Sequence, residues 1–158
     1  MQLIVRLQRV SFALQRKGLT PLSRLIELTV RLVYGACLPA KTSIAPNVIF
    51  YHNALGVVLN HTCVISSGCQ IGTHVLLGGN GNEKGAPHLD EDVVVHAGAK
   101  LFGPIRVGRG AVIGANSVVM SDVPEGSLVT GVLGSVKKLG IDSAGYKLVR
   151  NVGERSAK

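Results

Sequence analysis

The chain has 158 residues, 46% of them apolar and only 4% aromatic, and its formal net charge is +8. Such a chain can bury one sizeable core, and its apolar content excludes intrinsic disorder. The basic excess lies at the ends, because residues 1–41 contain seven Lys or Arg and one acid, whereas residues 42–136 contain four and six. Nucleic-acid-binding domains usually combine a basic face with aromatic side chains that stack on bases, so we expect no nucleic-acid partner.

Neither a membrane span nor a secretory signal is expected, because no apolar run approaches the ~20 residues that cross a bilayer. The three cysteines, Cys37, Cys63 and Cys69, form no CxxC pair and are odd in number. These features favour a reduced, cytoplasmic protein whose cysteines are small apolar packing residues.

The first 36 residues have the pattern of a helical hairpin. Leu3, Leu7, Val10 and Leu14 fall on one face of a helix that ends at Gly18. Thr20-Pro21 is typical of an N-cap and first helical position, and the second helix is expected to run to about Tyr34. We expect this hairpin to cap one end of the next domain; alternatively, residues 1–34 form a basic amphipathic surface that rests on an anionic membrane or a partner.

A repeat of six residues organises residues 37–136, in which an aliphatic residue is followed by a small or polar one. The run is unbroken over its second half, at Leu89, Val95, Leu101, Val107, Ile113 and Val119. This period predicts a mainly β fold, a triangular parallel β-helix in which each hexad is one strand and one turn and three hexads complete a coil. The first residue of each hexad should point inward, and the second should be small where the chain bends.

We locate two slips in this period, near Gly56 and near Gln70. The fifth position of the hexads is small or β-branched, as at Thr62 and Gly68. A sandwich of alternating strands would have a period of two and is disfavoured. About four coils are expected in residues 37–136, followed by a C-terminal cap and a polar tail in residues 137–158.

The hexads, with steps such as Ile113-Gly114-Ala115, resemble those of the left-handed β-helix acyltransferases, which implies a left-handed coil and a homotrimer. Two segments, 51–58 and the glycine-rich 77–89, break the rhythm, and each contains a histidine. With the downstream segment 96–119, they resemble the serine acetyltransferase branch of that superfamily. The resemblance covers residues 37–136 and implies transfer of an acetyl group from acetyl-CoA to a hydroxyl.

His52 is the expected general base, because a neutral imidazole can take the proton of a hydroxyl as it attacks a thioester. The resemblance implies that His88 lies across the cleft, on a neighbouring subunit, and helps bind or orient the acceptor. A backbone N–H in the glycine-rich stretch 78–81 is a candidate oxyanion donor. Within this stretch, Gly79 is expected to contact the co-substrate.

Acetyl-CoA is the expected co-substrate, since a groove between coils can take its pantetheine arm where side chains are small. The resemblance implies contacts from Gly98 with Ala99 and from Ala115 with Asn116. Lys137 and Lys138, just beyond the last coil, are placed to meet its phosphates.

The chain departs from the serine enzymes where they carry charged residues. Tyr51 stands where they have Asp before the first histidine, segment 35–39 lacks their upstream acid, and Pro87 replaces the Arg before the second histidine. A sugar hydroxyl requires no ammonium pocket, and the segment 52–58 with the basic helical start is similar to enzymes of capsule and exopolysaccharide synthesis. We therefore expect an O-acetyltransferase acting on a surface-polysaccharide sugar, in the cytoplasm and at the inner face of the membrane.

Two alternatives stay open: a serine O-acetyltransferase of cysteine biosynthesis, and a non-catalytic trimeric β-helix scaffold. A metal site is not expected. Zinc carbonic anhydrases on this fold have a pattern of two histidines five residues apart, and here the gaps between successive histidines are 9, 13, 14 and 8. His61, His74 and His96 are therefore expected to be surface or packing residues.

Overall fold

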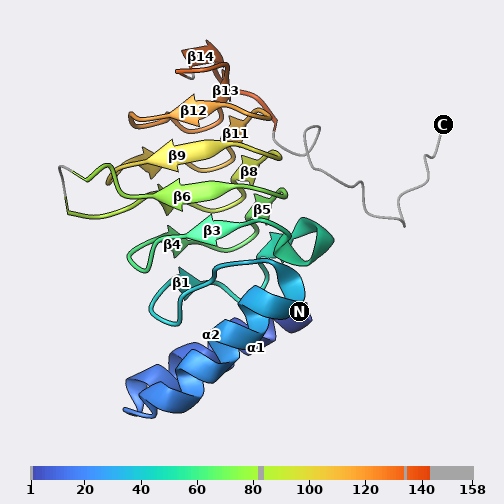
Figure 1. The fold of residues 1–158 in the computed structure, drawn as a ribbon. Helices are drawn as coiled ribbons and strands as arrows, with labels where there is room; N and C mark the ends of the chain where they lie inside the picture. Colours follow the sequence, from blue (N-terminus) through green and yellow to red (C-terminus); the bar gives the residue numbers. More distant parts are fainter. Residues whose placement is uncertain (1, 82–83, 134, 143–158) are drawn as a thin grey trace.

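The fold comes from a computed structural model, which describes residues 2–81, 84–133 and 135–142. Helices α1 (Leu3–Arg16) and α2 (Thr20–Tyr34) lie side by side at one end of a stack of β coils (Figure 1). Gly18 and Gly35 adopt φ angles of 78° and 62°, in the left-handed region that ends helices. The helical hairpin is thus confirmed, but α2 begins at Thr20 with Leu19 as its N-cap, so the predicted Thr20 cap is wrong.

The rest of the described chain consists of short strands and one 3-10 segment. In chain order these are β1 (Ser43–Ile44), β2 (Ile49–Phe50), η1 (Tyr51–Ala54), β3 (Val58–Leu59), β4 (Val64–Ile65), β5 (Gln70–Ile71), β6 (Leu76–Gly78), β7 (His88–Leu89), β8 (Val94–Val95), β9 (Lys100–Phe102), β10 (Arg106–Val107), β11 (Val112–Ile113), β12 (Val118–Val119), β13 (Leu128–Thr130) and β14 (Ser135–Lys138).

These strands form the three faces of a prism. The sheets have the orders β1-β4-β7-β10, β3-β6-β9-β12 and β2-β5-β8-β11-β13-β14, and every pair is parallel except β13 with β14. Strands β1 to β12 therefore make four coils of three strands each, stacked along the axis in Figure 1. The parallel β-helix predicted from the period of six is confirmed.

The core is a continuous column of aliphatic side chains inside the prism. The first residues of the hexads point inward and are almost fully buried: Ile44, Phe50, Leu59, Ile65, Ile71, Leu77, Leu89, Val95, Leu101, Val107, Ile113 and Val119. Fully burying side chains of this size contributes about 1.5–3 kcal/mol each relative to leaving them exposed. Stacking of the coils, rather than the short strands themselves, therefore stabilises the fold.

One of the two expected slips in the period is wrong. Strands β4, β5 and β6 begin at residues 64, 70 and 76, so the period is intact near Gln70. The fifth positions here are consequently Cys63 and Cys69, both buried, rather than Thr62 and Gly68. The slip near Gly56 is confirmed, because β3 begins nine residues after β2 and the extra residues form η1. The loop before β7 adds six residues, since β7 begins twelve residues after β6.

A small residue at the second hexad position is not a general requirement, since Tyr51, His96 and Phe102 occupy it. Glycine is needed where the next coil comes close. A Cβ on Gly72 would lie 2.6 Å from the backbone N of Ala97, and one on Gly108 would lie 2.5 Å from that of Glu125. These contacts are far inside van der Waals distance, so the two glycines set the spacing between coils.

The stretch expected to cap the solenoid contains one further strand. Strand β14 pairs antiparallel with β13 and carries Lys137 and Lys138. The tail predicted for the end of the chain falls mostly in residues 143–158, outside the described residues. Among the described helices, none has the length and apolar character that a transmembrane helix needs.

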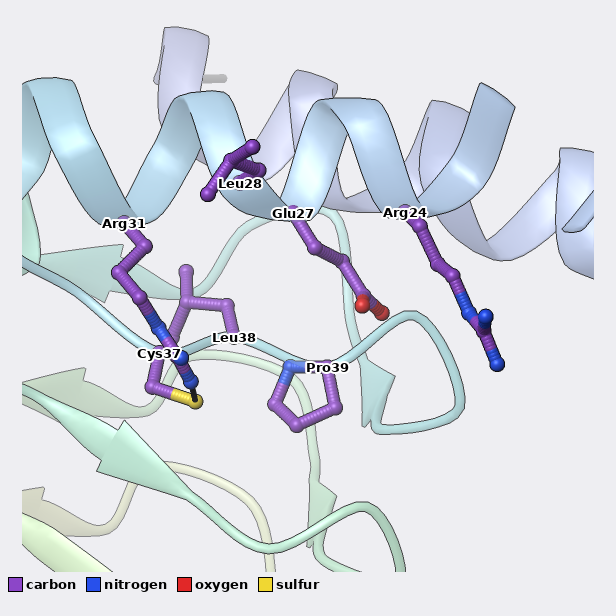
Figure 2. A pocket seen from close by; sticks show the side chains of 7 residues that line it. All are labelled: Arg24, Glu27, Leu28, Arg31, Cys37, Leu38 and Pro39. Atoms are coloured by element: carbon purple, nitrogen blue, oxygen red, sulfur yellow. Dashed lines mark hydrogen bonds between the residues drawn. The ribbon is translucent and has the colours of Figure 1, made fainter. Parts of the chain in front are cut away.

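The joint between α2 and the first coil contains a small pocket of 280 Å³ (Figure 2). Arg31 donates a hydrogen bond to the Sγ atom of Cys37 at 3.1 Å, an interaction that raises the pKa of the guanidinium. The Glu27 carboxylate accepts a hydrogen bond of 2.5 Å from the backbone N of Ala40. Figure 2 shows Arg24, Glu27 and Arg31 pointing from α2 toward the solenoid. The polar edge of α2 therefore faces the β coils.

The three thiols should differ in reactivity. Burial raises the pKa of the Cys63 thiol to about 11 and that of Cys69 to about 12, so both stay protonated at pH 8. Because the thiolate is the nucleophile, a chromogenic disulfide reagent at pH 8 should modify only Cys37 in the folded chain and all three thiols after unfolding. Equal rates for all three in the folded protein would contradict the packing.

The same pKa shifts predict a dependence of stability on pH. The folded-state pKa values lie above the ordinary value of 9.0, so the contribution of these thiols to stability is complete below pH 9. It is lost as the pH rises through the folded values. A variant with Val at positions 63 and 69 should lose less stability between pH 8 and pH 10.5 in denaturant titrations; an equal loss would refute this cause.

Candidate functional site

His52 lies on the corner between two faces of the prism, within η1. Three successive non-glycine residues, His52, Asn53 and Ala54, have φ angles of 50°, 54° and 61°. The left-handed conformation costs an L-residue about 1–2 kcal/mol, so this corner is locally strained. Such strain persists only where packing over-determines it, and it clusters at functional sites. The fully buried Ala54 anchors the corner to the core.

The His52 side chain is exposed in the single chain, and exposed apolar residues precede and follow it in the sequence. Leu55 is 48% exposed, Val58 41% and Ile49 38%, although all three are large and aliphatic. Tyr51, which precedes the histidine, donates its hydroxyl to the Oε1 atom of Gln70 at 3.0 Å and ties the corner to the next coil. The backbone of the corner is thus held by Tyr51 and Ala54, and the His52 imidazole is exposed and open to a partner.

The second departure from the repeat is the loop between β6 and β7. It extends away from the stack on the side of the view in Figure 1 opposite to η1. Its base is narrow, since a Cβ on Gly79 would lie 3.2 Å from the carbonyl O of Gly85. The backbone N–H of Gly79 has no hydrogen-bond partner among the described residues. This free N–H is consistent with the donor role expected for the stretch 78–81. A hollow of 580 Å³ beside the loop is lined in part by Gly79 and Lys84.

His88 opens β7 and belongs to a charged group that the sequence analysis missed. Its Nε2 atom lies 3.7 Å from the Oδ1 atom of Asp90. The Nε of Arg106 donates to both oxygens of Asp90, at 3.1 and 3.0 Å, which raises the pKa of the guanidinium. Arg106 is the register partner of His88 on the adjacent strand β10. A coil is 18 residues long here, so the repeat itself is the signal that pairs these two positions.

The two expected catalytic histidines do not meet within one chain. His52 follows β2 of the six-stranded sheet, whereas His88 lies on β7 of the β1-β4-β7-β10 sheet, two coils further along. Within the described residues no contact links them. A site that uses both histidines therefore requires residues from two chains.

Most of the backbone groups expected to hold CoA are already used by the solenoid. The N–H groups of Gly98, Ala99 and Asn116 donate to carbonyl groups of Thr73, His96 and Ala97, respectively. Ala99 is also fully buried. Ala115 is exposed, and its N–H has no partner among the described residues. Of the four expected positions, Ala115 thus offers the free backbone donor.

Gly98 has a separate structural reason to be glycine. Its φ angle is 74°, and a Cβ there would lie 2.0 Å from the Oδ1 atom of Asn116 on the next coil. Gly56 and His74 repeat this arrangement, since a Cβ on Gly56 would lie 2.4 Å from the His74 ring. Successive coils thus pair a glycine with a larger left-handed residue at this corner.

The remaining predicted residues lie on the surface. Lys137 and Lys138 on β14 are exposed, as are His61 and His74, while His96 is half-buried. Across residues 2–81, 84–133 and 135–142, no group of three or more His, Cys, Asp or Glu side chains could hold a metal ion.

The fold and the η1 corner together define a class of protein. Its members are parallel β-helices built from hexads, with a histidine at a corner where the repeat is interrupted. Over 130 residues the chain is 38% identical to a serine acetyltransferase of Bacillus licheniformis, which covers 81% of this chain and 60% of that protein. No family model matches the sequence.

Solved structures give the same result. A serine acetyltransferase in complex with CoA matches with a TM-score of 0.79 and 31% identity, over 84% of this chain and 55% of that one. Soybean serine acetyltransferase complexed with serine matches with a TM-score of 0.80 and 32% identity over the same shares. The resemblance to serine acetyltransferases is confirmed, and the finer resemblance to capsule and exopolysaccharide enzymes is not supported. The chain spans 60% or less of the length of these relatives.

Proposed function

We propose that the protein transfers an acetyl group from acetyl-CoA to the hydroxyl of serine or a serine-like acceptor, with His52 as the general base. The observation that carries this proposal is the strained corner that holds an exposed imidazole, in a solenoid similar to enzymes solved with CoA and with serine. His52 takes the hydroxyl proton as the oxygen attacks the thioester carbonyl, and the tetrahedral intermediate then breaks its C–S bond while the protonated His52 returns that proton to the departing CoA sulfur. The N–H of Gly79 of the neighbouring chain is the proposed donor to the oxyanion, because within one chain this loop lies on the side opposite to His52 (Figure 1).

The site is proposed to lie between subunits of a homotrimer. His88 of one chain faces His52 of its neighbour, which supplies the second histidine that a single chain leaves two coils away. The exposed Ile49, Leu55 and Val58 around His52 support this arrangement, because clustered apolar side chains mark interaction surfaces. The same seam holds CoA, with Ala115 at the pantetheine arm and Lys137 and Lys138 at the phosphates.

A serine acceptor requires one group that binds its ammonium and one that binds its carboxylate. The sequence analysis favoured a sugar because no acid near His52 could bind an ammonium group. Asp90 and Arg106, which lie beside His88, can supply both groups. Asp90 offers a carboxylate to the ammonium group. Arg106 uses its Nε for Asp90, so its terminal N–H groups remain for a carboxylate. The names of the similar proteins favour the same acceptor, which the sequence analysis placed second.

An acceptor screen tests this choice. Release of CoA thiol from acetyl-CoA is measured with L-serine, with serine methyl ester, with ethanolamine and with a set of sugars and nucleotide sugars. We expect turnover with L-serine and a KM at least tenfold higher for the two analogues that lack a carboxylate, because Arg106 then has no partner. Turnover with a sugar but not with L-serine would overturn the proposed acceptor. No turnover with any acceptor would favour the scaffold.

A further inference from the structure

The hairpin leaves most of its apolar side chains uncovered. On α2 only Ser23 and Val30 are buried, whereas five large apolar residues are 48% to 75% exposed. These are Leu22, Leu25, Leu28, Leu32 and Val33. At 100° per residue Leu25, Leu28 and Leu32 fall on the side of the helix opposite to Ser23 and Val30, and Leu22 and Val33 lie between the two sides. Capping the solenoid therefore explains only a narrow stripe of this helix.

Helix α1 extends the same uncovered surface. Its buried residues include Ile4, Val5 and Gln8, and Gln8 donates to the carbonyl of Thr42 in the first coil. On its opposite side Leu3 is 60% and Val10 50% exposed. The hydroxyl of Ser11 contacts the hydroxyl of Ser23 at 3.0 Å, so the two helices are locked side by side. Together they form an end face of the molecule, away from the coils (Figure 1).

We define this end face as Leu3, Leu22, Leu25, Leu32 and Val33, and leave out Val10 because it lines a hollow together with Thr42 and Ile44 of the first coil. Each of these side chains is large, apolar and exposed, and exposed apolar side chains that gather on one surface mark interaction sites. No charged side chain belongs to it. The polar edge of α2, with Arg24, Glu27 and Arg31, points instead toward the solenoid (Figure 2).

The charge around the end face identifies the kind of partner. The cations Arg6, Arg16 and Lys17 are exposed, and none forms an ion pair within the described residues. Glu27 is the one acid of residues 1–41, and its carboxylate already accepts a hydrogen bond from the backbone N of Ala40. A second copy of this chain packed against the face would bring like charges together. An anionic lipid surface would accept both the apolar side chains and the cations.

We propose that the end face docks the protein on anionic membranes, with the helix axes parallel to the bilayer surface and the β coils projecting away from it. This inference does not depend on the proposed acetyl transfer. It assigns a role to side chains that neither the core nor the candidate site uses.

Vesicle flotation of the full chain tests the proposal. Vesicles of phosphatidylglycerol mixed with phosphatidylcholine are compared with phosphatidylcholine alone, at low and at high salt. The wild-type protein should float with the anionic vesicles at least tenfold more than with the neutral ones, and less so at high salt. The double variant Leu25→Glu/Leu32→Glu should lose at least 90% of this binding. Val132→Glu makes the same apolar-to-carboxylate change at an exposed position near the other end of the solenoid, and this control should bind as the wild type does.

Two results would overturn the proposal. One is equal flotation of wild type and the Leu25→Glu/Leu32→Glu variant, provided that both melt cooperatively. The other is a wild-type assembly in vesicle-free solution whose mass, measured by light scattering, falls when the same two leucines become Glu. That second result would make the face an interface between copies of the chain.

Discussion

Replacing His52 with alanine is expected to lower kcat for acetyl transfer about 10³-fold, because a positioned imidazole base contributes about 10²- to 10⁴-fold. The KM for acetyl-CoA should change little, since the imidazole acts on the acceptor hydroxyl. The variant should fold normally, because the side chain is exposed and makes no packing contact that the core requires. The measurement is CoA release under saturating acetyl-CoA and acceptor.

The matched control is His74→Ala. His74 is an exposed imidazole that packs over Gly56 at the same corner of the next coil, and it has no role in the proposed chemistry. This variant should keep kcat within about threefold, whatever small stability it loses. A His52→Ala enzyme that is folded and retains more than a tenth of the wild-type kcat would show that another group removes the proton.

The substitution Gly108→Ala should have the largest effect on stability, a loss of about 3 kcal/mol in the free energy of unfolding. Overpacking a tight interior costs about 1–3 kcal/mol, and here the added Cβ meets backbone atoms, which cannot rotate away. The coils on either side of Gly108 must separate to relieve the contact, which also weakens their hydrogen bonds. Denaturant titration of the folded chain measures this loss.

Ser66→Ala provides the control for this change. Ser66 occupies the same corner column two coils earlier and already carries a Cβ, so its truncation should alter stability by less than about 0.5 kcal/mol. If Gly108→Ala also costs less than that, the coil spacing is not fixed by the glycine and the interpretation of the second hexad position fails.

The β-helix could be predicted from the period of six because this period reflects one repeated physical requirement. Every sixth side chain must enter a narrow prism. The spacing of Leu89, Leu101 and Ile113 therefore indicates where each strand lies and which of its side chains points into the core. The register near Gln70 was harder to predict from the sequence. Cys63 and Cys69 are the buried apolar residues there, and Thr62 and Gly68 lie beside them in the turns. Composition alone does not separate a small buried residue from a small turn residue.

The site was only partly predictable for a different reason. His52 and His88 stand out because each interrupts the repeat, but Asp90 and Arg106 obey it and carry no local signal. Their contact depends on the coil length, which places Arg106 beside His88 on the adjacent strand. The exposure of the α2 leucines could likewise not be predicted from the sequence. An amphipathic pattern indicates that a helix has an apolar face, but not what covers that face.

A subunit-mixing experiment tests the central claim, that acetyl transfer uses His52 of one chain and His88 of its neighbour. The variants His52→Ala and His88→Ala are each purified, shown to be nearly inactive, then unfolded, mixed in equal amounts and refolded together. Random mixing in a cyclic trimer leaves about a quarter of the seams with both histidines intact, so activity should return to about a quarter of the wild-type level. If the mixed trimers stay as inactive as the separate variants, the two histidines do not share a site across the seam.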